Sequence, residues 1–290
     1  MNKLKPLDFE VAGFTFKRLG FDSFDLYAHY FRNASYEDMT FYGSFPLMMR
    51  RRFGFKIIDG YLAIFRFIRK ETGLRIDCIG LPINEKGERL DVANTRKCLE
   101  MFNSSFDSPG RGRITHLHPA LNARYPYPEL APSEKLNVLE YVYNNDLLAG
   151  LQGGEFRNLR KAFNNFANHH SVEIVPYEKK FREDADRLYL KWCAGEGAKY
   201  AGVWDNKLFA NLLDNYGVID HHLFMVIEKS SGACIGLFDA VRINPQFAIG
   251  VMRKLDTGYE NIAVYCQVFL ARYLAEKACT FLNDGDDAGR

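Results

Sequence analysis

The feature that most constrains the fold of this chain is an order of predicted elements that occurs twice. Each half shows two helical patterns, a strand hairpin, a further strand, a helix and a closing strand. In the first half the hairpin turn is Asp59-Gly60, because both residues tolerate the positive φ that such turns need. In the second half the longest amphipathic pattern covers residues 261–278. An order that occurs twice predicts tandem copies of one α/β unit.

The predicted helices show apolar residues at the spacing of one helix face. They cover residues 21–31, 42–52, 94–106, 156–167, 182–194, 204–215 and 261–278. The predicted strands are alternating or short apolar runs that end at turn signals. They cover residues 56–58, 61–67, 74–79, 114–117, 172–175, 223–228, 234–243, 247–252 and 280–283. Closely spaced prolines between residues 119 and 132 indicate an irregular crossing segment, so we predict an N-terminal lobe, 1–135, and a C-terminal lobe, 136–290.

Composition narrows the class of protein. With 290 residues, of which 47% are hydrophobic, the chain has enough apolar material for two buried cores. A net charge of +2 argues against a dedicated DNA-binding protein and leaves room for a local basic patch. The most apolar runs are interrupted by Arg66, Gln267 or Arg272, and the first ten residues contain no apolar core. We therefore expect no integral membrane segment, no signal peptide and a cytoplasmic protein.

The spacing of cysteines and histidines favours neither a disulfide framework nor a metal site. The six cysteines show no C-x-x-C spacing, which is typical of reduced, buried thiols. His116 and His118 would share one face of a strand, but no cysteine or carboxylate nearby completes a ligand set. We expect no metal ion and no permanently bound cofactor.

Several segments together carry a resemblance to a known family. In the second half these are Glu140-Tyr141-Val142-Tyr143, Leu148, Gly153-Gly154, Phe156, Arg160, Asn164 and Phe166, with Leu282-Asn283, Asp287 and Gly289 at the end. In the first half they are Asp38-Met39-Thr40-Phe41 and Asp59-Gly60-Tyr61. In order and spacing the chain resembles the phosphatidylglycerol lysyltransferase C-terminal-like family over nearly its whole length. The family pattern continues into a Gly-Leu-Arg stretch and a final strand, whereas this sequence stops at Arg290, so we expect a second lobe without its last strand.

The resemblance implies an α/β fold of tandem GNAT-like lobes, each a mixed, mostly antiparallel sheet flanked by helices. Acyl-CoA N-acyltransferases and transferases that take amino acids from aminoacyl-tRNA share this fold. The expected activity is transfer of an acyl or aminoacyl group to an amine or hydroxyl of a small-molecule or peptide acceptor, with acyl-CoA or aminoacyl-tRNA as co-substrate. Because no membrane segment is predicted, we expect an acceptor other than a membrane lipid. The alternative is a binding or regulatory module that keeps the fold without turnover.

The junction at residues 253–261 is the candidate anion site for a donor. Arg253 and Lys254 could neutralise phosphate, and Gly258 permits close backbone approach. With Thr257 and Asn261 they make up the predicted cofactor-binding set, at the start of the helix predicted to follow. The segment lacks a Gly-x-Gly pattern, and a capped helix start, with Asp256 or Thr257 as N-cap, explains it equally well.

A basic stripe is the candidate for binding nucleic acid or another anion. Arg157, Arg160 and Lys161 fall on one face of the helix predicted over 156–167 and could grip tRNA phosphates or an anionic lipid head group. A solvated helix face explains the same pattern.

The catalytic candidates lie in the last helix and after the last predicted strand. Asn283 and Asp287 would position the acceptor and remove its proton, and Tyr265 would give a proton to the leaving group. The competing explanations are a surface turn for the run Asn-Asp-Gly-Asp-Asp and core packing for Tyr265.

Overall fold

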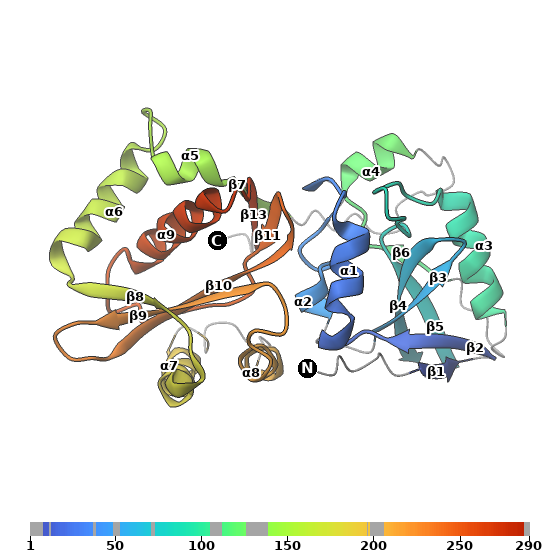
Figure 1. Ribbon diagram of the computed structural model, residues 1–290, viewed down its shortest axis with the longest axis horizontal. Coiled ribbons are helices and arrows are strands. Elements are labelled where there is room, and N and C mark those ends of the chain that lie inside the picture. The colour runs from blue at the N-terminus through green and yellow to red at the C-terminus, as the bar shows by residue number, and fades with distance from the viewer. Residues whose placement is uncertain are drawn as a thin grey trace. The chain divides into compact units, whose positions relative to one another are not determined.

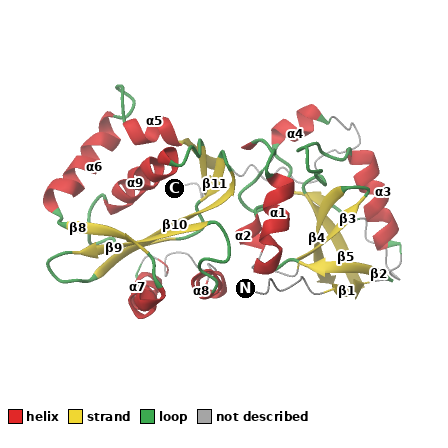
Figure 2. Ribbon diagram, viewed as in Figure 1, coloured by secondary structure: helices red, strands yellow, loops and turns green. Residues whose placement is uncertain are grey.

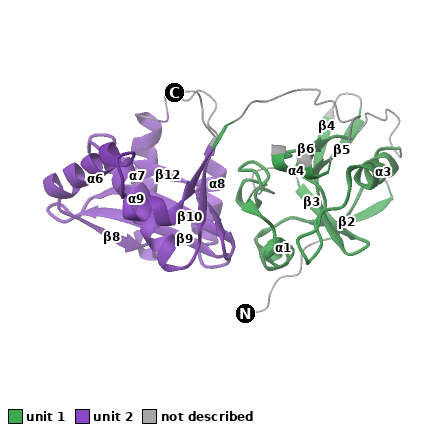
Figure 3. Ribbon diagram, turned by 90° about the horizontal axis from the view of Figure 1, so that it is seen from above, with its two compact units in different colours: residues 1–140, 286–290 green, residues 141–285 purple. Residues whose placement is uncertain are grey.

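The computed structural model describes residues 8–11, 13–36, 39–48, 53–70, 73–104, 112–125, 139–195, 197 and 206–286. The chain divides into two compact units (Figure 3). Unit 1 comprises Met1–Glu140 with Asp286–Arg290, and unit 2 comprises Tyr141–Gly285. The division predicted between residues 135 and 136 falls outside the described residues.

Unit 1 is built on a sheet in which the strands follow in sequence order. The strands are β1 (Asp8–Val11), β2 (Phe14–Arg18), β3 (Phe53–Ile58), β4 (Tyr61–Lys70), β5 (Gly73–Ile79) and β6 (Ile114–Thr115). β1 to β5 pair antiparallel and β6 joins parallel to β5. The predicted hairpin is confirmed: Asp59 (φ 49°) and Gly60 (φ 81°) both take positive φ between β3 and β4.

Four helices accompany this sheet in the described part of unit 1. They are α1 (Phe24–Phe31), which follows a single 3-10 turn (Phe21–Ser23), α2 (Phe45–Met48), α3 (Val92–Asn103) and α4 (Pro119–Arg124). α3 packs its apolar face on the sheet, where the ring of Phe102 lies 5.2 Å from Phe16 and 5.3 Å from Phe65 between centroids. Asp91 caps the helix by accepting from the Asn94 N–H at 2.8 Å.

Unit 2 is built on a seven-stranded sheet of order β7-β13-β11-β10-β9-β8, with β12 also paired to β10. The strands are β7 (Glu140–Asn144), β8 (Val172–Pro176), β9 (His221–Glu228), β10 (Cys234–Asn244), β11 (Phe247–Ile249), β12 (Arg253–Leu255) and β13 (Phe281–Asp286). β11 and β13 run parallel, whereas β10 pairs antiparallel with β9, β11 and β12. The predicted architecture of mixed, mostly antiparallel sheets flanked by helices is confirmed.

Helices cover both faces of the second sheet. They are α5 (Asn145–Gly150), α6 (Arg157–His169), α7 (Arg182–Ala194), α8 (Asn206–Asp214) and α9 (Ile262–Glu276). Figures 1 and 2 show α5, α6 and α9 on one face and α7 and α8 on the other. Cys266 and Leu270 of α9 and Phe166 of α6 lie in one buried cluster with the sheet residue Phe238. Both faces of the sheet are therefore covered by helices, and alternate residues of a strand point to different sets of helices.

Several predicted elements differ from the structure, among them the strand predicted over 280–283, which runs on to Asp286, and the strand predicted over 114–117, which ends at Thr115. The helix predicted over 42–52 is helical over Phe45–Met48, and residues 49–52 lie outside the described part. The strand predicted over 247–252 ends at Ile249, because a bulge interrupts its pairing with β10. The junction predicted at 253–261 begins as strand β12, and the N-cap of α9 is Asn261, not Asp256 or Thr257.

The described structure also bears on the expectations for thiols, metal ions and membrane-spanning helices. All six cysteines are free thiols. Within the described residues, no three His, Cys, Asp or Glu side chains are arranged to hold a metal ion. No helix in the described ranges combines the length and apolar composition needed to cross a bilayer.

Candidate functional site

The most distinctive local feature of unit 2 is the point where two neighbouring strands separate. β11 and β13 pair in parallel up to Ile249 and Asn283, and the Gly250 N–H donates to the Asn283 carbonyl at 2.8 Å. Beyond this point β12 pairs with β10, whereas β13 continues to Asp286 beside β7. β12 has no paired strand on its other edge in the described sheet, so the two strands separate here, and this split between β12 and β13 is called the opening below.

Charged side chains from both strands meet at this opening. The Arg253 guanidinium donates to both carboxylate oxygens of Asp284 and to the side-chain carbonyl of Gln267 on α9. The Asp284 side chain is 14% exposed and that of Arg253 is 31% exposed. The pair is therefore shielded on the α9 side and still reachable from solvent.

Burial sets the electrostatics of this cluster. Burial raises the pKa of Asp284, and the negative charge of Asp239 adds to the rise, while Arg253 opposes it. Burial also raises the pKa of Tyr143 on β7, and the nearby Asp284 contributes to this. The carboxyl group is thus held where either a proton or a cationic ligand stabilises it.

Gly250 leaves the space that the Asp284 carboxylate occupies. A Cβ at position 250 would lie 2.9 Å from Asp284 Oδ1, closer than non-bonded atoms approach. The absence of a side chain at this position therefore lets the carboxylate sit against the backbone where the strands part.

The predicted phosphate-binding pair does not converge. Arg253 points to the α9 side, whereas Lys254 lies over the ring of Trp192 on α7, with its Nζ 3.5 Å from the ring centroid, and is 5% exposed. Consecutive strand residues face opposite sides of a sheet, so one anion cannot contact both side chains from one face. Of the remaining predicted residues, Gly258 donates its N–H to Asp256 Oδ1 at 3.2 Å and Asn261 adopts φ 66° at the N-cap of α9. Thr257 lies in the same turn, directly before Gly258.

The catalytic candidates lie in packed positions or outside the described residues. Asn283 is fully buried and accepts the Gly285 N–H at 3.0 Å within its own strand. Tyr265 packs against α6, with ring centroids 5.0 Å from Phe163 and 4.6 Å from Phe166. Asp287 lies outside the described residues.

The basic stripe on α6 divides into two kinds of residue. Arg160 donates to the carbonyls of Leu151 and Gly153, at 3.0 Å for Gly153, and so holds the turn that precedes the helix. Arg157 and Lys161 are exposed on the same helix. The structure therefore leaves these two cations available on the surface and gives Arg160 a local structural role.

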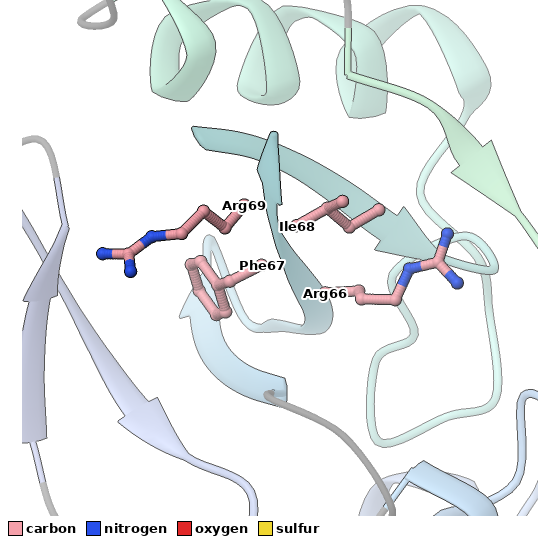
Figure 4. A pocket seen from close by; sticks show the side chains of 4 residues that line it. All are labelled: Arg66, Phe67, Ile68 and Arg69. Carbon is pink, nitrogen blue, oxygen red and sulfur yellow. The ribbon is translucent and has the colours of Figure 1, made fainter. Parts of the chain in front are cut away.

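Unit 1 carries a cavity of about 410 Å³ lined by Arg66, Phe67, Ile68 and Arg69 of β4. Its two guanidinium groups point in opposite directions (Figure 4). Arg66 contacts the fully buried Asp77 at 3.3 Å. Because its charges do not converge, the cavity is a weaker candidate than the opening in unit 2.

Asp284 and Gln267 are the residues of the candidate site that the sequence analysis missed. Asp284 directly follows the predicted residue Asn283. Because Asp-Gly is a common turn signal, the sequence predicted a turn here, whereas the strand continues to Asp286. Gln267 is a polar residue in the middle of the helix predicted over 261–278, and this was the sequence signal that α9 supplies a side chain to the site. In the structure Gln267 is only 8% exposed, as expected for a polar side chain with a partner.

The described strands and helices define a two-unit α/β protein with mixed, mostly antiparallel sheets flanked by helices. More specifically, the chain belongs to the family described as phosphatidylglycerol lysyltransferase, C-terminal, whose sequence profile matches residues 132–285. No curated protein shows significant sequence similarity to the chain.

Solved structures share the fold at low identity. A conserved protein of unknown function from Bacteroides thetaiotaomicron is 16% identical with a TM-score of 0.74, over 95% of this chain and 91% of that chain. L-PGS from Bacillus licheniformis is 14% identical with a TM-score of 0.54, over 86% of this chain and 72% of that chain. FemX is 10% identical with a TM-score of 0.55, over 97% of this chain and 89% of that chain. Likeness at these identities establishes the fold alone.

Proposed function

We propose that this protein transfers an aminoacyl group from an aminoacyl-tRNA to an amine or hydroxyl group of a small-molecule or peptide acceptor. The observation that carries the proposal is the partly buried Asp284 carboxylate, paired with Arg253 at the opening between β12 and β13. The family description, which names a lysyl transfer, supports an aminoacyl rather than a plain acyl group.

The Asp284 carboxylate favours an aminoacyl donor because such a donor carries an α-ammonium group beside its reactive carbonyl. A carboxylate has about four acceptor positions, and Arg253 fills only part of them. A charge-assisted hydrogen bond in a partly desolvated site stabilises the complex by roughly 1.5–3 kcal/mol. Acyl-CoA is the weaker alternative donor, because Asp256 and Glu260 add negative charge to the turn where its phosphates would approach.

The transfer requires alignment more than a reactive side chain. The acceptor nitrogen or oxygen forms a bond to the aminoacyl carbonyl carbon, the bond from this carbon to the ribose oxygen breaks, and the proton of the acceptor ends on the ribose oxygen. Asp284 would hold the α-ammonium, and Arg253 would keep the carboxylate ionised and oriented.

The tRNA part of the donor needs a positive surface. Arg157 and Lys161 are exposed one helical turn apart on α6 and fit this role. Neutralising each phosphate releases counterions, so a variant with Arg157→Ala and Lys161→Ala is expected to bind tRNA more weakly. The slope of its affinity against salt should fall by roughly 2. An unchanged slope would move the tRNA contact elsewhere.

The test compares binding of an aminoacyl-tRNA with binding of the same tRNA after N-acetylation of its amino acid, which removes the ammonium charge. The protein should prefer the free amine by about 10-fold to 150-fold, the equivalent of about 1.5–3 kcal/mol. Asp284→Asn should abolish this preference. Asp256→Asn is the matched control: Asp256 pairs with Lys191 at 2.6 Å, and the preference should persist.

Each of the other outcomes would assign a different function to the protein. Equal affinity for the two tRNA forms together with saturable binding of acetyl-CoA would replace the proposal with an acyl-CoA transferase. Binding of aminoacyl-tRNA without discharge to amines, alcohols or phosphatidylglycerol vesicles would make the chain a binding module.

A further inference from the structure

A one-residue bulge decides which side chain of β12 faces Asp284. β10 pairs Val241 with Ile249, and with an unbroken register Phe238 would face Met252. Instead Phe238 pairs with Arg253, so one additional residue lies on the β11–β12 side. Without this residue Arg253 and Lys254 would exchange faces of the sheet, because side chains alternate along a strand.

A buried carboxylate on β10 holds the bulge. Asp239 Oδ1 accepts the N–H groups of Val251 and Met252 at 2.8 and 2.7 Å, and the Asp239 N–H donates to the Met252 carbonyl at 3.1 Å. Two consecutive N–H groups on one oxygen are possible only where the strand is bulged. The carboxylate thus replaces the strand carbonyl that regular pairing would supply.

His221 of β9 supports this carboxylate from the other side. Its Nε2 lies 2.8 Å from Asp239 Oδ2, and both side chains are fully buried. Within the described structure, His221 Nδ1 has no hydrogen-bond partner. Nε2 is the ring nitrogen that contacts the carboxylate, so Nδ1 is left as a buried polar atom. A buried carboxylate and an unsatisfied nitrogen both cost stability, which indicates that the pair is retained for the geometry that it imposes.

We propose that the His221–Asp239 pair is the positioning device of the candidate site: it fixes the bulge and thereby keeps Arg253 on the face of Asp284. Its effect on transfer rests on the proposed function, whereas its effect on β12 does not. Neither residue touches Asp284 by a hydrogen bond in the described structure, so both act through the backbone that carries Arg253.

The negative charge of Asp239 also affects the pKa of Asp284, apart from its role in holding the bulge. Asp284 is influenced by burial, by Arg253 of β12 and by Asp239 of β10, and Tyr143 of β7 lies close enough to interact with it. On α9, Cys266 lies within the electrostatic influence of Arg253. Removing the charge of Asp239 should therefore lower the pKa of Asp284. Because donor binding needs the ionised carboxylate, the loss of binding in acid (the acid limb of the pH profile) should then occur at lower pH.

The test uses the full chain and a built-in reporter. Trp192 contacts Lys254, and its emission should change if β12 slips by one residue and Lys254 leaves the ring. A Trp204→Phe background leaves Trp192 as the only tryptophan. In this background His221→Ala should shift the Trp192 emission and reduce the preference for free over N-acetylated aminoacyl-tRNA at least 10-fold. His221→Gln, which keeps a donor towards Asp239, should restore both.

Asp77→Asn is the matched control, because Asp77 of unit 1 is another fully buried carboxylate, with Arg66 and Arg75 as partners. It should leave the Trp192 emission and the donor preference unchanged. If His221→Ala does not fold, His221→Phe carries the test, because it fills the space of the imidazole without a donor to Asp239 and should shift the emission in the same way. Asp239→Asn, whose amide oxygen still accepts both bulge N–H groups, should keep the emission and extend donor binding to lower pH.

The outcomes separate the two proposals. Wild-type emission and preference in a folded His221→Ala variant overturn the positioning role. A shifted emission in His221→Ala, in a protein whose wild type shows no donor preference, supports the positioning role and removes the proposed function.

Discussion

Gly250→Ala is the substitution that probes the site most locally. The new methyl group would lie 2.9 Å from Asp284 Oδ1, while its next nearest neighbour, the Asp239 carbonyl oxygen, is 3.6 Å away. The φ of Gly250 lies outside the left-handed range, so the backbone accepts alanine without strain. The clash is therefore with the carboxylate alone, and relief requires Asp284 to move away from its position beside Arg253.

The magnitude follows from two opposing contributions. Overpacking in a well-packed site costs about 1–3 kcal/mol. Replacing glycine by alanine reduces the entropy of the unfolded chain and offsets about 0.4–1 kcal/mol. The expected net destabilisation of about 1–2 kcal/mol corresponds to a fall in Tm of about 2–4 °C per kcal/mol for a domain of this size. Because the Asp284 carboxylate is displaced, the preference for free over N-acetylated aminoacyl-tRNA should also fall.

Gly154→Ala is the matched control, because a Cβ at position 154 meets nothing within 4 Å. It should change stability by less than about 0.5 kcal/mol and leave the donor preference intact. The assay is thermal denaturation followed by circular dichroism, together with filter binding of the two tRNA forms. If the Gly250→Ala protein melts with the Gly154→Ala protein and keeps the preference, the placement of Asp284 against the backbone at Gly250 is wrong.

Three further predictions concern stability and thiol chemistry. Asn103→Ala should destabilise unit 1 by about 2–3 kcal/mol in denaturant titration, because the Asn103 side chain bonds both the N–H and the carbonyl of buried Ile76 at 3.0 Å; a cost under about 0.5 kcal/mol contradicts this. Asp91→Ala should cost about 1 kcal/mol at pH 7. Because backbone N–H bonds from Asn94 lower the pKa of Asp91 in the fold, its contribution is present above the unfolded pKa and is lost as pH falls through the folded pKa, so a deficit that stays constant in acid refutes the cap. Burial raises the pKa of Cys78 and Cys266 to about 12, so these thiols should resist alkylation at pH 8 until the protein is unfolded, and rapid labelling of either in the native state contradicts their burial.

Local signals predicted the framework well where a short segment determines its own structure. The Asp59-Gly60 turn carries its conformation in two residues, and the pattern over 261–278 gave α9 to within two residues at each end, Ile262–Glu276. β1 and β2 were missed although Phe14 and Phe16 alternate with polar residues, because strands this short carry a weak pattern.

The site was less predictable because it depends on pairing between distant strands. Arg253 and Lys254 are neighbours in sequence, and only the pairing of β12 with β10 separates them onto two faces. The bulge that sets this pairing depends on Asp239, more than ten residues earlier, and no local pattern marks it. Similarly, Asp284 is part of a strand only because β7 and β13 pair, and a turn was the better local prediction for Asp-Gly.

The proposed discharge of aminoacyl-tRNA to an acceptor at the opening between β12 and β13 can be measured directly. The most direct measurement is a single-turnover assay in which tRNA charged with labelled amino acid is mixed with excess protein and a panel of amines, alcohols and phosphatidylglycerol vesicles. We expect acceptor-dependent transfer of label that is lost with Asp284→Asn and retained with Asp256→Asn. Transfer that survives Asp284→Asn, or label that stays on the tRNA with every acceptor while acetyl-CoA is turned over, contradicts the proposal.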